Sequence, residues 1–267
     1  LIINTIKEVE QNWEKIKKKE KKHKNVLENI PKSLPPITKS MHIQKKVCAV
    51  GFDWDNKEQV MEKFDEEIME MKNEIKKRLD NSVTDTLLLL EHPHVITLGR
   101  QTKPGDVLDN SMPIVEIDRG GSATYHGPGQ LIGYVIIDLR RKGISVPTLI
   151  TKIHESLIRT LSELDIKAER KRKKPGVWIE QKKIASIGLS VRNWITYHGF
   201  SLNIDTDLGK FKIIRPCGFD SQIMTSINYN KKRKYSMEII KSSIIRNFVD
   251  VFEYYKIEKK LKASYSN

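Results

Sequence analysis

The chain has 267 residues, and its 48 Lys and Arg against 34 Asp and Glu give a formal net charge of +14. Hydrophobic residues make up 38% and charged residues 31%, proportions that exclude both a disordered chain and a membrane-spanning protein. Two cysteines, Cys48 and Cys217, are too few for a disulfide-stapled domain or a four-cysteine zinc site. The excess positive charge indicates an acidic partner.

The N-terminal part of the chain is strongly basic. Residues 14–25 hold seven lysines against two glutamates, and prolines follow at positions 31, 35 and 36. We expect residues 1–45 to be a mobile extension or residual presequence, 46–258 one compact domain, and 259–267 a tail. The basic leader, in a chain rich in Lys, Asn and Ile, favours an organelle (a plastid such as an apicoplast, or a mitochondrion) over a bacterial-type cytoplasm.

From residue 50 onward, apolar periodicity predicts helices and strands in a definite order. The first is an amphipathic helix over 57–80, followed by short strands over 86–91 and 95–98 and a longer strand over 131–139. A second helix follows over 147–164, then strands over 177–180, 183–192 and 195–204. A last helix, capped by Ser236, carries Ile240, Ile244, Phe248 and Tyr255 on its apolar face. This order predicts an α/β (α+β) fold with a mixed sheet flanked by helices, antiparallel after residue 175.

The segment Arg119–Gln130, RGGSATYHGPGQ, is the first candidate for chemistry. Its four glycines and one proline predict a loop whose backbone comes close to something else. It matches neither a dinucleotide-binding fingerprint nor a P-loop. A tight turn with a surface histidine, or a single RNA-binding RGG element, are the alternatives.

The second candidate is Cys217, which a proline precedes and a glycine follows. A thiol on such a bend can act as a nucleophile if a cation or base lies nearby, although a lone cysteine is more often a small buried hydrophobe. Lys182, Lys183, His126 and His198 are the available activators. A metal site is not expected, because the only close histidine pair, at positions 92 and 94, has no partners at ligand spacing.

Two further basic clusters, Arg170–Lys174 and Lys231–Lys234, fall between predicted elements, so we expect them on loops. They are candidate docking patches for an acidic protein. General solubilising charge is an equally good explanation for them.

Four motifs in order resemble the lipoyl(octanoyl) transferases, over roughly residues 50–255. They are LLLLEHPHVITLGR (87–100), RGGSATYHGPGQLIGYVIIDL (119–139), GVWIEQKKIASIGLSVRNWITYHGFSLNI (176–204), and PCG with MTSI (216–227). This family transfers octanoyl groups from acyl carrier protein to proteins and has a biotin/lipoate-protein-ligase-like fold. Departures from the family pattern are Tyr197 in place of an aliphatic residue and His94 in place of a proline.

The resemblance implies roles for individual residues. Cys217 would be the acyl-thioester nucleophile, and Lys183, which directly precedes I-A-S-I-G, would be the lysine that lowers its pKa. The implied substrate-binding residues are Arg119, Gly120, Gly121, Ser122, Ala123, Thr124, Tyr125, His126, Ser186, Ile187, Gly188, His198, Gly199, Phe200 and Ser201. Backbone N–H groups of the 119–121 turn and the 217–218 turn are candidates for an oxyanion site. Ile187, Leu131 and Ala185 are candidate walls for the acyl chain.

The implied chemistry is ping-pong acyl transfer through a cysteine thioester, the first step of endogenous protein lipoylation. It requires no cofactor, because the donor carries its own phosphopantetheine on acyl carrier protein, and no ATP, because the amide product is more stable than the thioester. The implied acceptors are lipoyl domains of 2-oxoacid dehydrogenase E2 subunits and the H protein of glycine cleavage. Neither a nucleic acid nor a membrane is an expected partner. An ATP-dependent lipoate or biotin ligase on the same fold, and a basic nucleic-acid-binding protein, are the rival interpretations.

Overall fold

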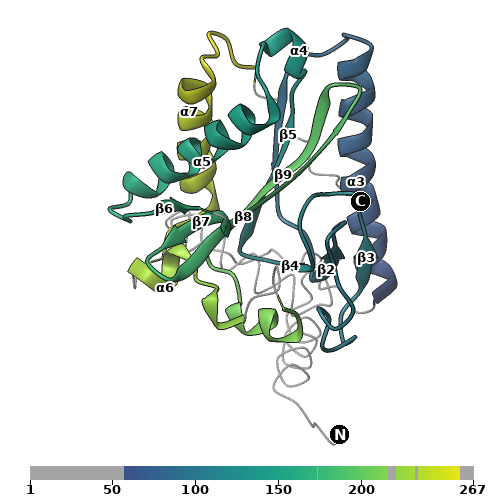
Figure 1. Cartoon of the computed structure of the whole chain (residues 1–267), viewed down its shortest axis with the longest axis vertical. Helices are drawn as coiled ribbons and strands as arrows, with labels where there is room; N and C mark the ends of the chain where they lie inside the picture. Colours follow the sequence, from purple (N-terminus) through teal and green to yellow (C-terminus); the bar gives the residue numbers. More distant parts are fainter. Residues whose placement is uncertain (1–56, 173, 216–220, 232–233, 259–267) are drawn as a thin grey trace, which may run out of the picture. The chain divides into compact units, whose positions relative to one another are not determined.

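The computed structural model describes residues 57–172, 174–215, 221–231 and 234–258 (Figure 1). The chain divides into two units, residues 1–61 and 62–267. The expected N-terminal extension and its boundary at residue 45 lie outside the described residues and stay predictions, as does the tail beyond 258. Within the described part of the chain, no helix combines the length and apolarity needed to cross a membrane.

The centre of the second unit is a six-stranded sheet in the order β1-β5-β9-β8-β7-β6. Every neighbouring pair in it is antiparallel. Its strands are β1 (Thr86–Leu90), β5 (Gln130–Ile136), β6 (Glu169–Lys171), β7 (Lys174–Ile179), β8 (Lys182–Arg192) and β9 (Ile195–Asn203).

A three-stranded sheet, β3-β2-β4, makes the architecture mixed. It is formed by β2 (Val95–Leu98), β3 (Ile114–Glu116) and β4 (Thr124–His126). Strand β2 pairs parallel with β3 and antiparallel with β4, and among the named strands of the described residues β2–β3 is the only parallel pair.

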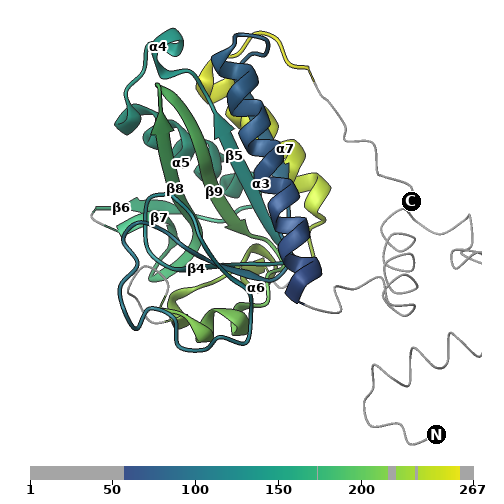
Figure 2. The same ribbon diagram turned by 90° about the vertical axis from the view of Figure 1, so that its right-hand side faces the viewer.

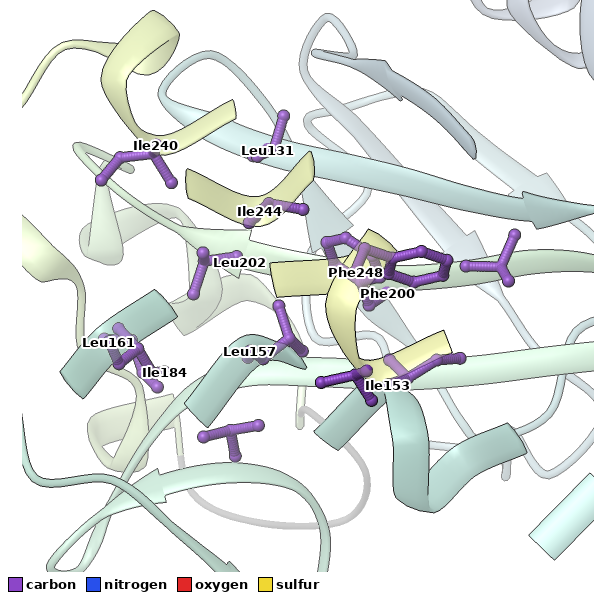
Figure 3. Close-up of a cluster of buried hydrophobic side chains, with 14 of the residues drawn as sticks. Leu131, Ile153, Leu157, Leu161, Ile184, Phe200, Leu202, Ile240, Ile244 and Phe248 are labelled. Atoms are coloured by element: carbon purple, nitrogen blue, oxygen red, sulfur yellow. The ribbon is translucent and has the colours of Figure 1, made fainter. Parts of the chain in front are cut away.

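The helices cover both faces of the large sheet (Figures 1 and 2). They are α3 (Lys57–Leu79), α4 (Leu139–Lys142), α5 (Val146–Ser162), α6 (Ile227–Lys231) and α7 (Met237–Phe252), with 3₁₀ turns η1 (Leu208–Ile213) and η3 (Ser221–Ile223). Helices α5 and α7 pack on one face through a continuous apolar core that includes Leu157, Phe248 and Leu202 (Figure 3). Helix α3 packs on the other face, where Met71 meets Ile132.

The helices on the α5/α7 face begin where the sequence predicts them. The Ser145 hydroxyl accepts from the Thr148 N–H at 3.3 Å and caps α5, and the Ser236 hydroxyl caps α7 through the Ile239 N–H. Helix α7 ends earlier than expected, because Glu253 adopts a left-handed conformation with φ of 58°. Tyr255, expected on the helix, therefore follows it and is fully exposed.

Two of the expected loops contain strands. Within the glycine-rich segment 119–130, residues 124–126 form β4 and Gln130 opens β5. In the basic cluster 170–174, Arg170 and Lys171 belong to β6 and Lys174 to β7, so this cluster lies on a β-hairpin at the sheet edge. The expectation that both segments are loops throughout was wrong, because neighbouring strands supply hydrogen-bond partners that local composition does not reveal.

Candidate active site

A cavity of about 560 Å³ lies beside β8. Strand β7 pairs with β8 only as far as Ala185, and the cavity begins where β7 leaves this edge. Twelve of the residues singled out from the sequence line it, from three separate segments: Arg119, Gly120, Gly121, Thr124, His126, Ser186, Ile187, Gly188, His198, Gly199, Phe200 and Ser201.

The 119–121 turn is fixed against the sheet. The Gly120 N–H donates to the Leu189 carbonyl at 3.1 Å. The backbones approach so closely that a Cβ on Gly188 would lie 2.7 Å from the Gly120 carbonyl oxygen. The Gly120 N–H is therefore already occupied within the fold, and an oxyanion site elsewhere in the 119–121 turn stays a prediction.

Arg119 is a buried cation at the cavity wall. Its Nη2 donates to the carbonyl oxygen and to the hydroxyl of Thr97, both at 2.9 Å, and its Nη1 donates to the Gly120 carbonyl at 3.0 Å. The guanidinium thus joins β2 to the glycine turn. Its positive charge also lowers the pKa of both His126 and His198, after the larger effect of burial.

Three histidines line one part of the cavity in neutral form. Burial lowers the pKa of His92 to about 3 and that of His198 to about 4, and it lowers the pKa of His126 well below its ordinary value. The Nδ1 of His126 lies 2.7 Å from the Gln130 side-chain oxygen. A neutral ring donates from one nitrogen only, so this contact places the proton of His126 on Nδ1.

The other two histidines have acidic partners. His92 bridges Glu67 of α3, through Nδ1, and the Tyr134 hydroxyl, through Nε2. The Nε2 of His198 lies 3.3 Å from Asp118, whose carboxylate also accepts from the Tyr197 hydroxyl. These hydrogen bonds fix the ring orientations on the cavity wall.

Lys183 is a fully buried lysine, with 1% of its surface exposed, whereas its neighbour Lys182 is exposed. Strand β8 shifts register against β7 at Val177–Trp178, beside this doublet. The Lys183 side chain runs past Gly176, which has a φ of +109° and lines the cavity: a Cβ there would lie 2.6 Å from Cε of Lys183. Local sequence left the choice between Lys182 and Lys183 open, and the structure places the Lys183 side chain in the interior.

Cys217 lies outside the described residues, as does Cys48. The described residues on its two sides are anchored: the Arg215 N–H donates to the Asp106 carbonyl at 2.8 Å, and the Thr225 N–H donates to the Lys183 carbonyl at 2.9 Å. Met224 forms a parallel bridge with Lys183. The chain that follows Cys217 by a few residues therefore passes directly beside Lys183.

Residues 65–249 match the family model of the lipoyl protein ligase A/B catalytic domain. The octanoyltransferase of Legionella pneumophila (strain Paris) is 46% identical over 164 residues, covering 61% of this chain and 82% of that protein. That of Azotobacter vinelandii is 46% identical over 149 residues, covering 54% and 66%. The chain belongs to the lipoyl(octanoyl) transferase family. It is therefore an acyltransferase, and the family resemblance read from the sequence is confirmed.

Solved structures show that this family member shares the lipoate-protein-ligase fold. Lipoate-protein ligase A bound with ATP has a TM-score of 0.56 at 16% identity, covering 68% of this chain and 80% of that chain. A putative lipoate protein ligase from T. acidophilum with bound lipoic acid has a TM-score of 0.54 at 16% identity, with the same coverage. The expected fold class is confirmed.

Some residues implied by the family resemblance lie away from the cavity. Tyr125 is fully buried against Phe211, and its hydroxyl lies 2.7 Å from His94. Ser122 donates to Asp106, and Ala123 is fully buried. Leu131 and Ala185, expected as acyl-chain walls, pack instead in the core beneath α5 and α7. Of the three expected walls, Ile187 alone lines the cavity.

Other cavity residues were missed from the sequence. His154 of α5 lines the cavity, and its ring nitrogens lie 2.8 Å from the Ile150 carbonyl and 3.2 Å from the Gly176 carbonyl. It follows Ile153 in an apolar helical stripe and carries no motif signal. His92 and Tyr134 lie within motifs that the family resemblance quoted, but their pairing across 42 residues becomes visible only in the fold.

Proposed function

We propose that this acyltransferase moves an octanoyl group from octanoyl-acyl carrier protein to the lysine of a lipoyl domain, through a thioester on Cys217. The observation that carries the proposal is the buried Lys183, whose side chain adjoins Gly176 on the wall of a cavity that the three predicted substrate-binding segments also line. The similar proteins named octanoyltransferase support the acyl group.

In the first step, the Cys217 thiolate attacks the thioester carbonyl of the donor. The new bond joins Cys217 Sγ to the acyl carbon, the C–S bond of the donor breaks, and the pantetheine sulfur leaves as a thiol with the proton of the Lys183 ammonium. A free thiol has a pKa of about 8.5 and is only slightly ionised at neutral pH. An ammonium at Lys183 favours the thiolate by direct attraction, which is strong where water is excluded.

In the second step, the acceptor lysine attacks the acyl-enzyme. The C–N bond of the amide forms, the C–S bond to Cys217 breaks, and the amine gives up a proton. We assign that proton to Lys183, which became neutral when it protonated the leaving pantetheine sulfur. The neutral amine is favoured at that stage, because Lys183 is buried and its counter-charge is lost once the thiolate is acylated. The amide is more stable than the thioester, so the cycle runs without ATP.

The cavity accounts for acyl-chain affinity. Burying about seven methylene and methyl groups at about 0.8 kcal/mol each contributes roughly 5–6 kcal/mol before ordering costs. Phe64, Ile132 and Ile150 supply apolar wall, and the neutral histidines avoid placing charges against the chain. Basic residues of the β6–β7 hairpin, such as Arg170, are our candidates for contacts with an acidic carrier protein.

The direct test is intact-mass spectrometry after mixing the protein with octanoyl-acyl carrier protein in the absence of ATP. One octanoyl adduct is expected, and Cys217→Ala should lose both the adduct and transfer to a lipoyl domain. A normal adduct in Cys217→Ala would refute the nucleophile assignment.

The lysine doublet offers a matched control for the proposed activation. Lys182 has an exposed side chain whose Nζ donates to the Gln222 carbonyl at 2.6 Å, whereas Lys183 is buried. Lys183→Met should move the pH profile of Cys217 alkylation by iodoacetamide to higher pH, and Lys182→Met should leave the profile in place. Identical profiles in the two variants would contradict the pairing.

An ATP-dependent ligase is the second candidate, because the fold is shared with lipoate-protein ligase A bound with ATP. A ligase would convert free octanoate and ATP into the octanoylated lipoyl domain. Product formed from octanoate only when ATP is present, with none from octanoyl-acyl carrier protein, would establish that candidate instead.

A further inference from the structure

Strand β8 presents a short backbone edge inside the cavity. Its pairing with β7 ends at Ala185. Farther along, the Gly120 N–H donates to the Leu189 carbonyl at 3.1 Å. Ile187 lies between these two points and lines the cavity. Among the described residues, no strand pairs with β8 on this side at Ile187.

The N–H and C=O of Ile187 point into this gap. Strands β8 and β9 keep an unbroken register from Ala185 to Arg192, and alternate residues of an antiparallel ladder turn their backbone groups to opposite sides. The Leu189 carbonyl faces Gly120, away from β9. Ile187 is two residues earlier, so its backbone groups face the same way. An N–H and a C=O on a strand edge can pair with an extended chain.

The gap suits an unbranched chain. Gly176 borders it on the β7 side, and Gly120 and Gly121 border it on the other. A Cβ on Gly176 would clash with the Ala185 carbonyl, and a Cβ on Gly188 would lie 2.7 Å from the Gly120 carbonyl oxygen. With backbone this close on both sides, an occupant without side chains meets the least steric resistance.

The position of Lys183 sets the distance that the arm of the donor has to span to reach Ile187. A Cβ built on Gly176 would lie 2.6 Å from Cε of Lys183 and would also touch the carbonyl oxygen of Ala185. The side chain of Lys183 therefore reaches the level of Ala185, two residues or about 7 Å along the strand from Ile187. In an extended pantetheine arm, the two secondary amides lie roughly 4 and 9 Å from the sulfur. An arm whose sulfur is beside Lys183 thus brings the unit between its two amides to the level of Ile187.

We propose that the β8 edge at Ile187 binds the pantetheine arm of the acyl donor by pairing with its two secondary amides. The Ile187 N–H donates to the carbonyl of one amide, and the Ile187 carbonyl accepts from the N–H of the other, because the N–H and C=O of a single trans amide point in opposite directions. This inference rests on the proposed function and adds the part of the donor that is recognised. The acceptor lysine side chain has no amide before its own main chain, so it does not offer this pairing.

The donor side of the test needs no protein variant. Octanoyl-pantetheine is compared with two analogues in which an ester oxygen replaces either amide N–H, and acyl-enzyme formation is followed by intact mass. One of the two replacements should lower kcat/KM by about 5- to 50-fold, because it leaves the Ile187 carbonyl unpaired. Equal kcat/KM for all three donors would overturn the pairing.

The protein side uses Ile187→Pro, which removes the N–H but leaves the β9 ladder intact because this N–H faces the free edge. Ile187→Ala, which keeps the N–H, measures the loss due to the side chain. Relative to Ile187→Ala, Ile187→Pro should lose a further 5- to 50-fold with octanoyl-pantetheine but not with S-octanoyl ethanethiol, which has no amide. Circular dichroism checks that the proline variant folds.

The outcomes separate the two proposals. An equal loss with both donors overturns the pairing, and so does a loss confined to transfer from the acyl-enzyme to the lipoyl domain, which would give the edge to the acceptor. If neither these thioesters nor octanoyl-acyl carrier protein acylates the wild-type protein, the proposed function itself fails, and this inference fails with it.

Discussion

Gly176→Ala tests how tightly β7 packs over Lys183. The new Cβ would clash with the Ala185 carbonyl and lie 2.6 Å from Cε of Lys183, at a residue whose φ is +109°. Overpacking a core costs about 1–3 kcal/mol, and holding alanine at positive φ adds about 1 kcal/mol. We therefore expect the free energy of unfolding to fall by about 2–4 kcal/mol, or roughly 5–15 °C in Tm for a domain of this size.

Gly143→Ala is the matched control. Gly143 also has a positive φ, +67°, but nothing lies within 4 Å of its Cβ position. It should lose only the backbone cost of about 1 kcal/mol and retain acyl-enzyme formation, whereas Gly176→Ala should also slow that reaction because Lys183 is displaced. Thermal unfolding and intact mass provide the two readouts. Equal losses of Tm in the two variants would show that the packing around Lys183 is not as tight as described.

Three further predictions concern residues that line the cavity or pack against its wall. Thr97→Val should lower the free energy of unfolding by about 1–3 kcal/mol in urea denaturation, because the buried Arg119 loses its hydroxyl partner. Thr97→Ser, which keeps a hydroxyl, should retain most of that free energy. Equal free energies of unfolding for the two variants would refute the role of the hydroxyl. The pKa of His198 is lowered to about 4, so between pH 6.5 and 4 the unfolded chain binds a proton that the folded chain does not. This proton uptake by the unfolded chain has no effect above pH 6.5 and removes roughly 3 kcal/mol of stability by pH 4. His198→Asn should flatten that part of the stability–pH curve, and an unchanged slope would show that His198 is not the source of the pH dependence. Gly133→Ala places a Cβ against the Phe200 ring and should cost about 1–3 kcal/mol. Combining it with Phe200→Leu should recover part of that loss, and strict additivity in a double-mutant cycle would rule out the clash.

The long elements could be predicted because their periodicity extends over several turns or pairs. The helical stripe that includes Phe64 and Met71 predicted α3 to within one residue, and alternation predicted β8 and β9 within one or two. Strand β6 has only three residues, none of them apolar. Its pairing with β7 is a tertiary interaction, and nothing local to its sequence signals it.

The site was predictable to the extent that short motifs marked it. The glycine turn, the small residues of β8 and the H-G-F-S run of β9 converge on one cavity because β8 and β9 pair in register, Gly188 opposite Gly199. The burial of Lys183 was not predictable from residues alone, because which lysine of the doublet turns inward depends on the register shift against β7. His154 was missed because a helical histidine beside an apolar stripe has no distinguishing local pattern.

The glycines of the central strands limit how the substrate range of this enzyme can change. A side chain at Gly199 would meet the Gly133 carbonyl, and one at Gly133 would meet the Phe200 ring. At Gly199, which lines the cavity, the strand wall therefore has no side chain that could be shortened, and selection for longer or bulkier acyl groups has to act on larger residues of the wall. Trimming Phe64 of α3 or Ile150 of α5, which face the same space, is the route that laboratory evolution should find first.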